Sequence, residues 1–129
     1  MLLYMGGGAA LADHYRRCRA IALADAASAC DVMARYAASH LGESGSDRVA
    51  MAKALAAAVD AREACAIASG LLNRRSELAG YLMAACADAC RRCADAADAL
   101  SPNETTARGL DACRHAEQVC RRALEVEAA

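Results

Sequence analysis

Alanine is the residue that most restricts the fold of this chain. It fills 37 of the 129 positions, whereas phenylalanine and tryptophan are absent and the single proline is Pro102. Alanine is the best helix former, and the β-branched and aromatic residues that favour strands are scarce here. The sequence therefore predicts an all-α fold, with a core of small side chains that gives little stability for its length.

Turn and capping residues mark the first two predicted helices. The first helix covers about residues 9–40 and ends at a loop rich in glycine and serine, residues 42–46. Ser46 or Asp47 is placed to cap the second helix, because short polar side chains accept hydrogen bonds from the first free backbone amides. This second helix is expected to continue to about residue 74.

The other two predicted helices follow after short connections. Ser76 is expected to cap the third, which reaches about residue 100. The fourth has the clearest start, with Ser101 as the N-cap, Pro102 at the first helical position and Glu104 completing a capping box. Since the connections are short, consecutive helices should be antiparallel neighbours, and an up-down-up-down four-helix bundle is predicted.

A single bundle domain is predicted for residues 9–129, because no change in composition divides the chain. Three consecutive glycines, Gly6 to Gly8, separate the first residues from this domain. We expect residues 1–8 to form a flexible or separately docked tail.

Charge and hydropathy exclude several classes of protein. The formal net charge is −1, from 15 basic and 16 acidic side chains, and no basic stripe with aromatic residues is present to bind nucleic acid. No apolar run reaches the roughly 20 residues of a membrane span. The apolar start lacks the basic residues of a secretory signal. These features predict a cytoplasmic protein, in which thiols stay reduced.

The eight cysteines are predicted to point into the bundle. At about 100° per residue, the three cysteines of the third helix share one face, opposite its charged residues, and those of the other helices can also reach the interior. Estimated heights along the bundle sort the thiols into two layers. One layer contains Cys18, Cys65, Cys86 and Cys120, and the other contains Cys30, Cys90, Cys93 and Cys113.

Inward-facing thiolates select soft or borderline metals, namely Cu(I), Zn(II) and the iron of iron–sulfur clusters. Zinc sites usually use compact C-x-x-C pairs on loops, whereas Cys90 and Cys93 form the sole such pair and lie within a helix. The fixed loop spacings of iron–sulfur proteins are missing. Cu(I) accepts two or three thiolates, so it suits cysteines spread along facing helices. Disulfides and simple packing of small apolar thiols are the alternatives, and Cys30 is the first candidate for packing.

Two segments of the sequence resemble a known family. They are Cys86-Ala-Asp-Ala-Cys90-Arg-Arg-Cys93-Ala-Asp-Ala-Ala and Cys113-Arg-His-Ala-Glu-Gln-Val-Cys120-Arg-Arg-Ala. Both are similar to the cysteine-lined helices of the copper storage proteins, and His14-Tyr15-Arg16-Arg17-Cys18 fits the opening helix of that family. The resemblance covers about residues 13–124. It implies a four-helix bundle, often tetrameric, that holds many Cu(I) ions with its thiolates.

The sequence departs from this family at several positions where a relative would carry cysteine. These positions hold Ala22, Ala26, Ala58, Ala97 and Ala116. A smaller store, a small thiolate-bound centre of copper, zinc or iron and sulfur with a catalytic or sensory role, and a metal-free interaction module therefore all stay open. The chain is expected to form a homodimer or homotetramer if the family pattern holds.

Three further residues are predicted to form an entrance for metal ions. Met33, His40 and Met51 converge near the loop that joins the first two helices, and they offer thioether and imidazole donors. His14 and His115 are expected at the surface. No arrangement typical of a hydrolase or a nucleotide-binding enzyme is visible, and no catalytic residue is predicted.

Overall fold

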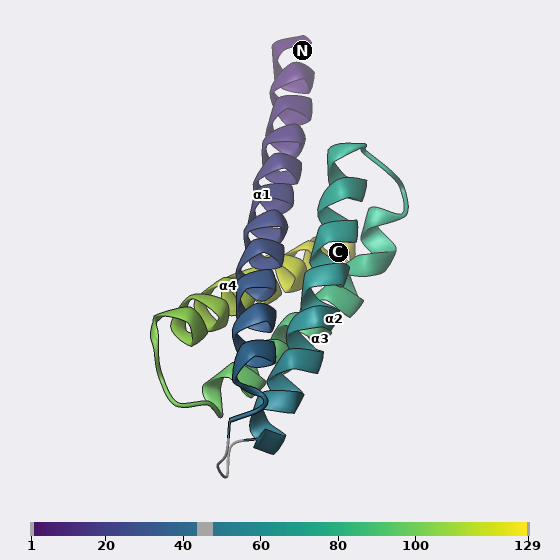
Figure 1. Cartoon of the computed structure of the whole chain (residues 1–129). Helices are drawn as coiled ribbons and strands as arrows, with labels where there is room; N and C mark the ends of the chain where they lie inside the picture. Colours follow the sequence, from purple (N-terminus) through teal and green to yellow (C-terminus); the bar gives the residue numbers. More distant parts are fainter. Residues whose placement is uncertain (1, 44–47, 129) are drawn as a thin grey trace.

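The computed structural model describes residues 2–43 and 48–128 and shows four α-helices, with no strand in these ranges. Each helix packs against its two neighbours in the order α1, α2, α3, α4 and back to α1, with the connections at alternating ends (Figure 1). The all-α four-helix prediction is therefore confirmed. No helix of the described part is long and apolar enough to cross a membrane. The helices are α1 (Leu2–His40), α2 (Arg48–Asn73), α3 (Ala79–Asp98) and α4 (Glu104–Ala128).

The first helix starts earlier than the sequence predicted. α1 begins at Leu2 and runs through Gly6 to Gly8, whereas the predicted start was near Ala9. Adding a residue to an existing helix fixes one residue for each new hydrogen bond, so a long helix can extend across poor helix formers. The N-terminal turns of α1 project beyond the other helices (Figure 1).

The cap of α4 differs from the predicted one. The Thr106 N–H donates to Asn103 Oδ1 at 2.9 Å, and the Asn103 N–H donates to Thr106 Oγ1 at 3.0 Å. Asn103 also donates through Nδ2 to the Tyr36 hydroxyl of α1 at 2.9 Å. Asparagine caps as well as serine does, and this reciprocal pair satisfies two free amides. Asn103, and not Ser101, is therefore the N-cap of α4.

The connection between α2 and α3 is closed by backbone hydrogen bonds. Arg75 has a positive φ of 56°, and the Ser76 N–H donates to the Leu71 carbonyl at 2.9 Å. This pattern ends a helix with one left-handed residue. Ser76 Oγ accepts a bond from the Leu78 N–H at 3.2 Å, but α3 begins only at Ala79. The prediction that Ser76 caps α3 was wrong, because the Ser76 N–H closes the turn after α2 and the residue before α3 is Leu78, which makes no side-chain cap bond. The predicted caps of α2, Ser46 and Asp47, lie outside the described residues.

The core is built from alanine, cysteine and a few larger side chains. Ser69 and Thr106 are its polar members among the described residues. Because alanine buries little area, sulfur atoms fill much of the space between the helices. The largest fully buried side chains are Leu23, Met33, Met83, Cys30, Cys65, Cys86, Cys90, Cys93, Cys113 and Cys120.

Replacing Gly109 by alanine is expected to lower the free energy of unfolding by about 1–3 kcal/mol. An added Cβ would lie 2.8 Å from Met33 Sδ, which is too close. Met33 is fully buried in the core, so its side chain has little room to move away. The matched control is Gly70→Ala in α2, where a Cβ would meet only the flexible end of Arg74 at 3.3 Å. That variant should gain about 0.5–1 kcal/mol from helix propensity. Urea denaturation compares the two, and equal stability would contradict the packing described here.

Candidate metal centre

Seven of the eight cysteines point into the bundle, and each has no exposed surface. α1 and α2 each provide one thiol, α3 provides three and α4 provides two. On α3 and α4 the thiols repeat every three, four or seven residues, which keeps them on one helical face. All eight cysteines carry free thiols. The seven buried ones, called the thiol cluster below, are Cys30, Cys65, Cys86, Cys90, Cys93, Cys113 and Cys120.

Three thiols from three different helices meet at one end of the thiol cluster. Cys30 Sγ lies 3.3 Å from Cys113 Sγ and 3.8 Å from Cys93 Sγ. All three sulfur atoms lie within 4.8 Å of one another, close enough to share one metal ion. Cys30 was the first candidate for simple packing, yet the structure places it at the centre of this group.

The other thiols continue the cluster along the bundle. Cys65 Sγ lies 3.3 Å from Cys90 Sγ, and the Cys86 thiol donates to the Ala64 carbonyl at 3.2 Å. Cys30, Cys93 and Cys113 of one predicted layer do lie together, but Cys90, which was assigned to the same layer, pairs with Cys65 of the other one.

Cys18 is the exception, because its side chain is exposed. The buried stripe of α1 follows Leu23, Cys30 and Met33. Cys18 precedes Cys30 by twelve positions, which places the two roughly 120° apart around the helix. The prediction that Cys18 reaches the interior was wrong. Its Sγ lies instead 3.6 Å from His14 Nε2. The spacing of four residues on one helix could have predicted this contact.

Hydrogen bonds among the thiols separate their pKa values. Hydrogen bonds from Cys120 and then Cys65 lower the pKa of Cys86, and bonds from Cys113 and Cys65 lower the pKa of Cys90. The pKa values of the donating thiols shift in the opposite direction. Donation to Cys86 raises the pKa of Cys65 and of Cys120, and burial adds to both shifts. The hydrogen bonds thus shift the pKa values of Cys86 and Cys90 downward and those of Cys65 and Cys120 upward.

The group around Cys30 also favours protonated thiols. Donation to Cys30 raises the pKa of Cys113, and donation to Cys113 raises that of Cys93. The bond from Cys113 lowers the pKa of Cys30, but its own bond to Cys93, together with burial, raises that pKa by more. Five buried thiols therefore have a pKa above the ordinary value of 9.0.

The stability of the reduced, metal-free protein is expected to fall as the pH rises above 9.0. Below this value the five thiols are protonated in both the folded and the unfolded chain, so their raised pKa values do not change the free energy of unfolding. Above it the unfolded chain loses these protons while the folded chain keeps them, so the free energy of unfolding decreases. The lowered pKa values of Cys86 and Cys90 act in the opposite direction, but only below 9.0. Urea denaturation under anaerobic conditions from pH 8 to 11 checks this, and a flat profile would contradict it.

The predicted entrance residues lie at different depths. Met33 is fully buried beside Gly109 of α4, whereas His40 and Met51 are half-buried. His40 is already engaged, since its Nδ1 lies 2.8 Å from Glu43 Oε1 and its ring packs against Tyr36 at 4.3 Å. An ion passing this end would therefore have to compete with Glu43 for the imidazole.

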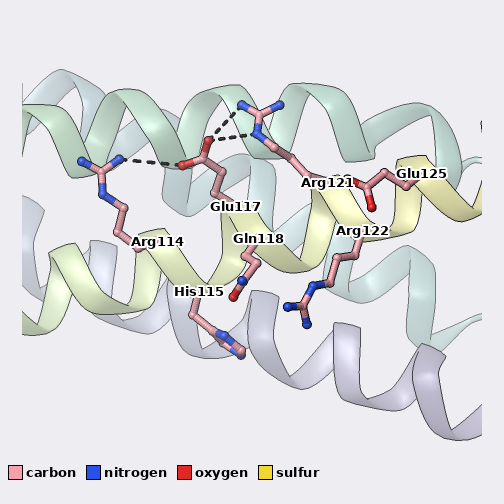
Figure 2. Close-up of a pocket in the computed structure, with 7 residues that line it drawn as sticks. All are labelled: Arg114, His115, Glu117, Gln118, Arg121, Arg122 and Glu125. Atoms are coloured by element: carbon pink, nitrogen blue, oxygen red, sulfur yellow. Dashed lines mark hydrogen bonds and ion pairs between the residues drawn. The ribbon is translucent and has the colours of Figure 1, made fainter.

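The outward face of α4 carries charge and no cysteine. Glu117 lies between Arg114 and Arg121, with nitrogen–oxygen distances of 3.8 and 2.9 Å, while His115 and Arg122 point to the other side of the helix (Figure 2). Ion pairs of this kind at the surface contribute little to stability. These residues line a solvated hollow at the surface, whereas Cys113 and Cys120 lie on the buried side of α4.

Comparison with known families supports the metal-binding interpretation. The family model described as copper storage protein matches residues 11–125, which include most of each helix and all eight cysteines. Searches of curated proteins and of solved structures gave no significant match. The family implies copper ions as the bound partner, and the buried sulfur donors fit a soft metal. Since the match covers most of its length, this chain belongs to the copper storage protein family.

Proposed function

We propose that this protein binds and stores copper as Cu(I), held by the thiolates of the thiol cluster. The observation that carries the proposal is the convergence of buried thiols from different helices. The sulfur atoms of Cys30, Cys93 and Cys113 lie within 4.8 Å of one another, and Cys65 Sγ lies 3.3 Å from Cys90 Sγ. The bundle therefore offers a group of three donors and a pair of donors, and Cys86 and Cys120 are also fully buried.

The composition of the cluster favours Cu(I) over the other thiophilic metals. The convergent group offers sulfur alone, without a histidine or carboxylate. Three sulfur donors suit Cu(I), whereas structural zinc requires four ligands in a tetrahedron and iron–sulfur clusters usually require four cysteines. Zn(II) and iron–sulfur centres are therefore the less favoured occupants.

The capacity of the store should be small. The five alanines at positions typical of cysteine in the family are all buried, so they lie in the core without offering a ligand. The same observation favours a second candidate, a small thiolate-bound centre of copper, zinc or iron and sulfur used in catalysis or sensing. The number of ions separates the two, because a store takes up several per chain and a dedicated centre takes up one.

Other features of the proposal follow from the need for reduced thiols. We place the protein in the cytoplasm, where cysteines stay reduced, and we expect a homodimer or homotetramer. The exposed apolar side chains of α1, among them Leu11, Tyr15, Ile21 and Val32, support association between copies. His40 and Met51 are proposed to admit ions, with Met33 one turn from Cys30 on the inner side.

Anaerobic titration with Cu(I) against a competing chelator tests the proposal. Uptake of more than one ion per chain, with affinity that rises with pH as thiol protons are displaced, is expected. Elemental analysis of protein purified under reducing conditions identifies the metal that is retained. Failure of the reduced protein to take Cu(I) from the chelator would remove the proposal.

A further inference from the structure

Cys18 and His14 form a pair of donors on the outside of α1, apart from the thiol cluster. The two side chains lie one turn apart on the same helical face, with Sγ and Nε2 separated by 3.6 Å. Both are exposed, and Cys18 is the one exposed thiol among the eight cysteines. Pairs of ligands at this spacing on a helix are a known way to hold a metal ion.

We propose that Cys18 and His14 bind one Cu(I) ion at the surface, in addition to the ions of the thiol cluster. An ion about 2.3 Å from a thiolate sulfur and about 2.0 Å from an imidazole nitrogen would meet donors 3.6 Å apart at an angle of roughly 115°. This angle leaves at least one coordination position open to solvent. An ion held by two protein ligands with an open position can exchange with small thiols outside the protein, whereas the ions of the thiol cluster are enclosed.

The surrounding charges favour a monovalent ion at this site. The neighbouring carboxylate, Asp13, forms ion pairs with Arg16, Arg17 at 3.3 Å and Arg75 at 2.8 Å, so it is not free to act as an oxygen ligand. Three arginines against one aspartate leave a surplus of positive charge. A monovalent ion bound to the Cys18 thiolate adds no net charge, whereas a divalent ion adds one more positive charge to a positive surface. Soft sulfur and nitrogen donors without oxygen select the same kind of ion.

Alkylation of Cys18 under anaerobic conditions tests this site. Iodoacetamide reacts with free thiolates, so the native reduced protein should be labelled first at Cys18. With Cu(I) supplied beyond saturation of the thiol cluster, labelling of Cys18, followed by mass spectrometry, should be about tenfold slower. In His14→Ala the ratio between the two rates should fall to about twofold or less, because one of the two ligands is lost.

The control is His115→Ala. His115 is another exposed histidine, and it lies on α4 in a surface hollow that no cysteine lines. This variant should keep the full protection of Cys18. Equal labelling rates with and without Cu(I), or full protection in His14→Ala, would overturn the inference.

The surface site and the thiol cluster can fail separately. Uptake of Cu(I) by the cluster without protection of Cys18 would remove the surface site alone. Protection of Cys18 in a variant whose α3 cysteines are all alanine, without uptake by the cluster, would support the surface site and contradict the proposed store.

Discussion

Replacing Cys86, Cys90 and Cys93 together by alanine is expected to remove most of the Cu(I) uptake. α3 supplies three of the seven buried thiols, among them Cys93 of the convergent group and Cys90, whose Sγ lies 3.3 Å from Cys65 Sγ. Cys30 and Cys113 keep their contact, but the group of three and the Cys65–Cys90 pair are lost, so the number of ions bound should fall by more than half and the affinity by at least about tenfold. Anaerobic titration against a chelator measures both quantities.

This triple variant should still fold, which makes its loss of copper informative. Alanine is a better helix former than cysteine, and the loss of each buried sulfur costs about 1 kcal/mol. Far-ultraviolet circular dichroism checks the helix content. The matched control is Cys18→Ala, which removes an exposed thiol and should lose no more than the single surface ion. Uptake by the triple variant equal to that of the parent would exclude the thiol cluster as the binding site.

Loading with Cu(I) is expected to raise the melting temperature by more than about 10 °C. A ligand at 1,000 times its dissociation constant stabilises the folded state by about 4 kcal/mol, and each kcal/mol shifts the melting temperature of a domain of this size by about 4 °C. Binding of Cu(I) to cysteines of the unfolded chain reduces this gain but does not cancel it, because the folded chain already brings the sulfurs together. The alanine-rich core contributes little stability of its own, so the relative effect is large.

Thermal unfolding of the reduced protein with and without chelator-buffered Cu(I) measures this shift. The triple variant of α3 should show a much smaller rise under the same conditions, since it lacks the shared ligands. Equal melting temperatures for the loaded and metal-free parent protein would show that copper does not bind inside the folded bundle.

The helix content and the four-helix arrangement could be predicted because alanine content and short polar connections both indicate them. Helix ends were harder to place. Ser101 and Asn103 are both good caps, and only the tertiary contact of Asn103 with Tyr36 and its exchange of bonds with Thr106 decide between them. The start of α1 was missed because local propensity at Gly6 to Gly8 is poor, whereas extension of a long helix costs little.

The orientation of the cysteines could be predicted wherever charged residues mark the outer face. On α3, for example, Asp88 and Arg91 lie opposite Cys90, and all three thiols of this helix are buried as expected. Much of α1 offers no such contrast, because alanine is tolerated on both faces of a helix. Cys18 was therefore predicted inside, whereas both Cys18 and the apolar Leu11 are exposed. The close approach of individual sulfurs depends on helix crossing and axial register, which periodicity does not determine.

The most direct measurement is a crystal structure of the Cu(I)-loaded protein, with an anomalous difference map collected at the copper absorption edge. The structure described here predicts copper peaks on the bundle axis. One peak should lie among Cys30, Cys93 and Cys113, and others should lie beside Cys90 and Cys65 toward the opposite end of the cluster. Copper found only at surface histidines or methionines, with none among the buried sulfurs, would contradict the account.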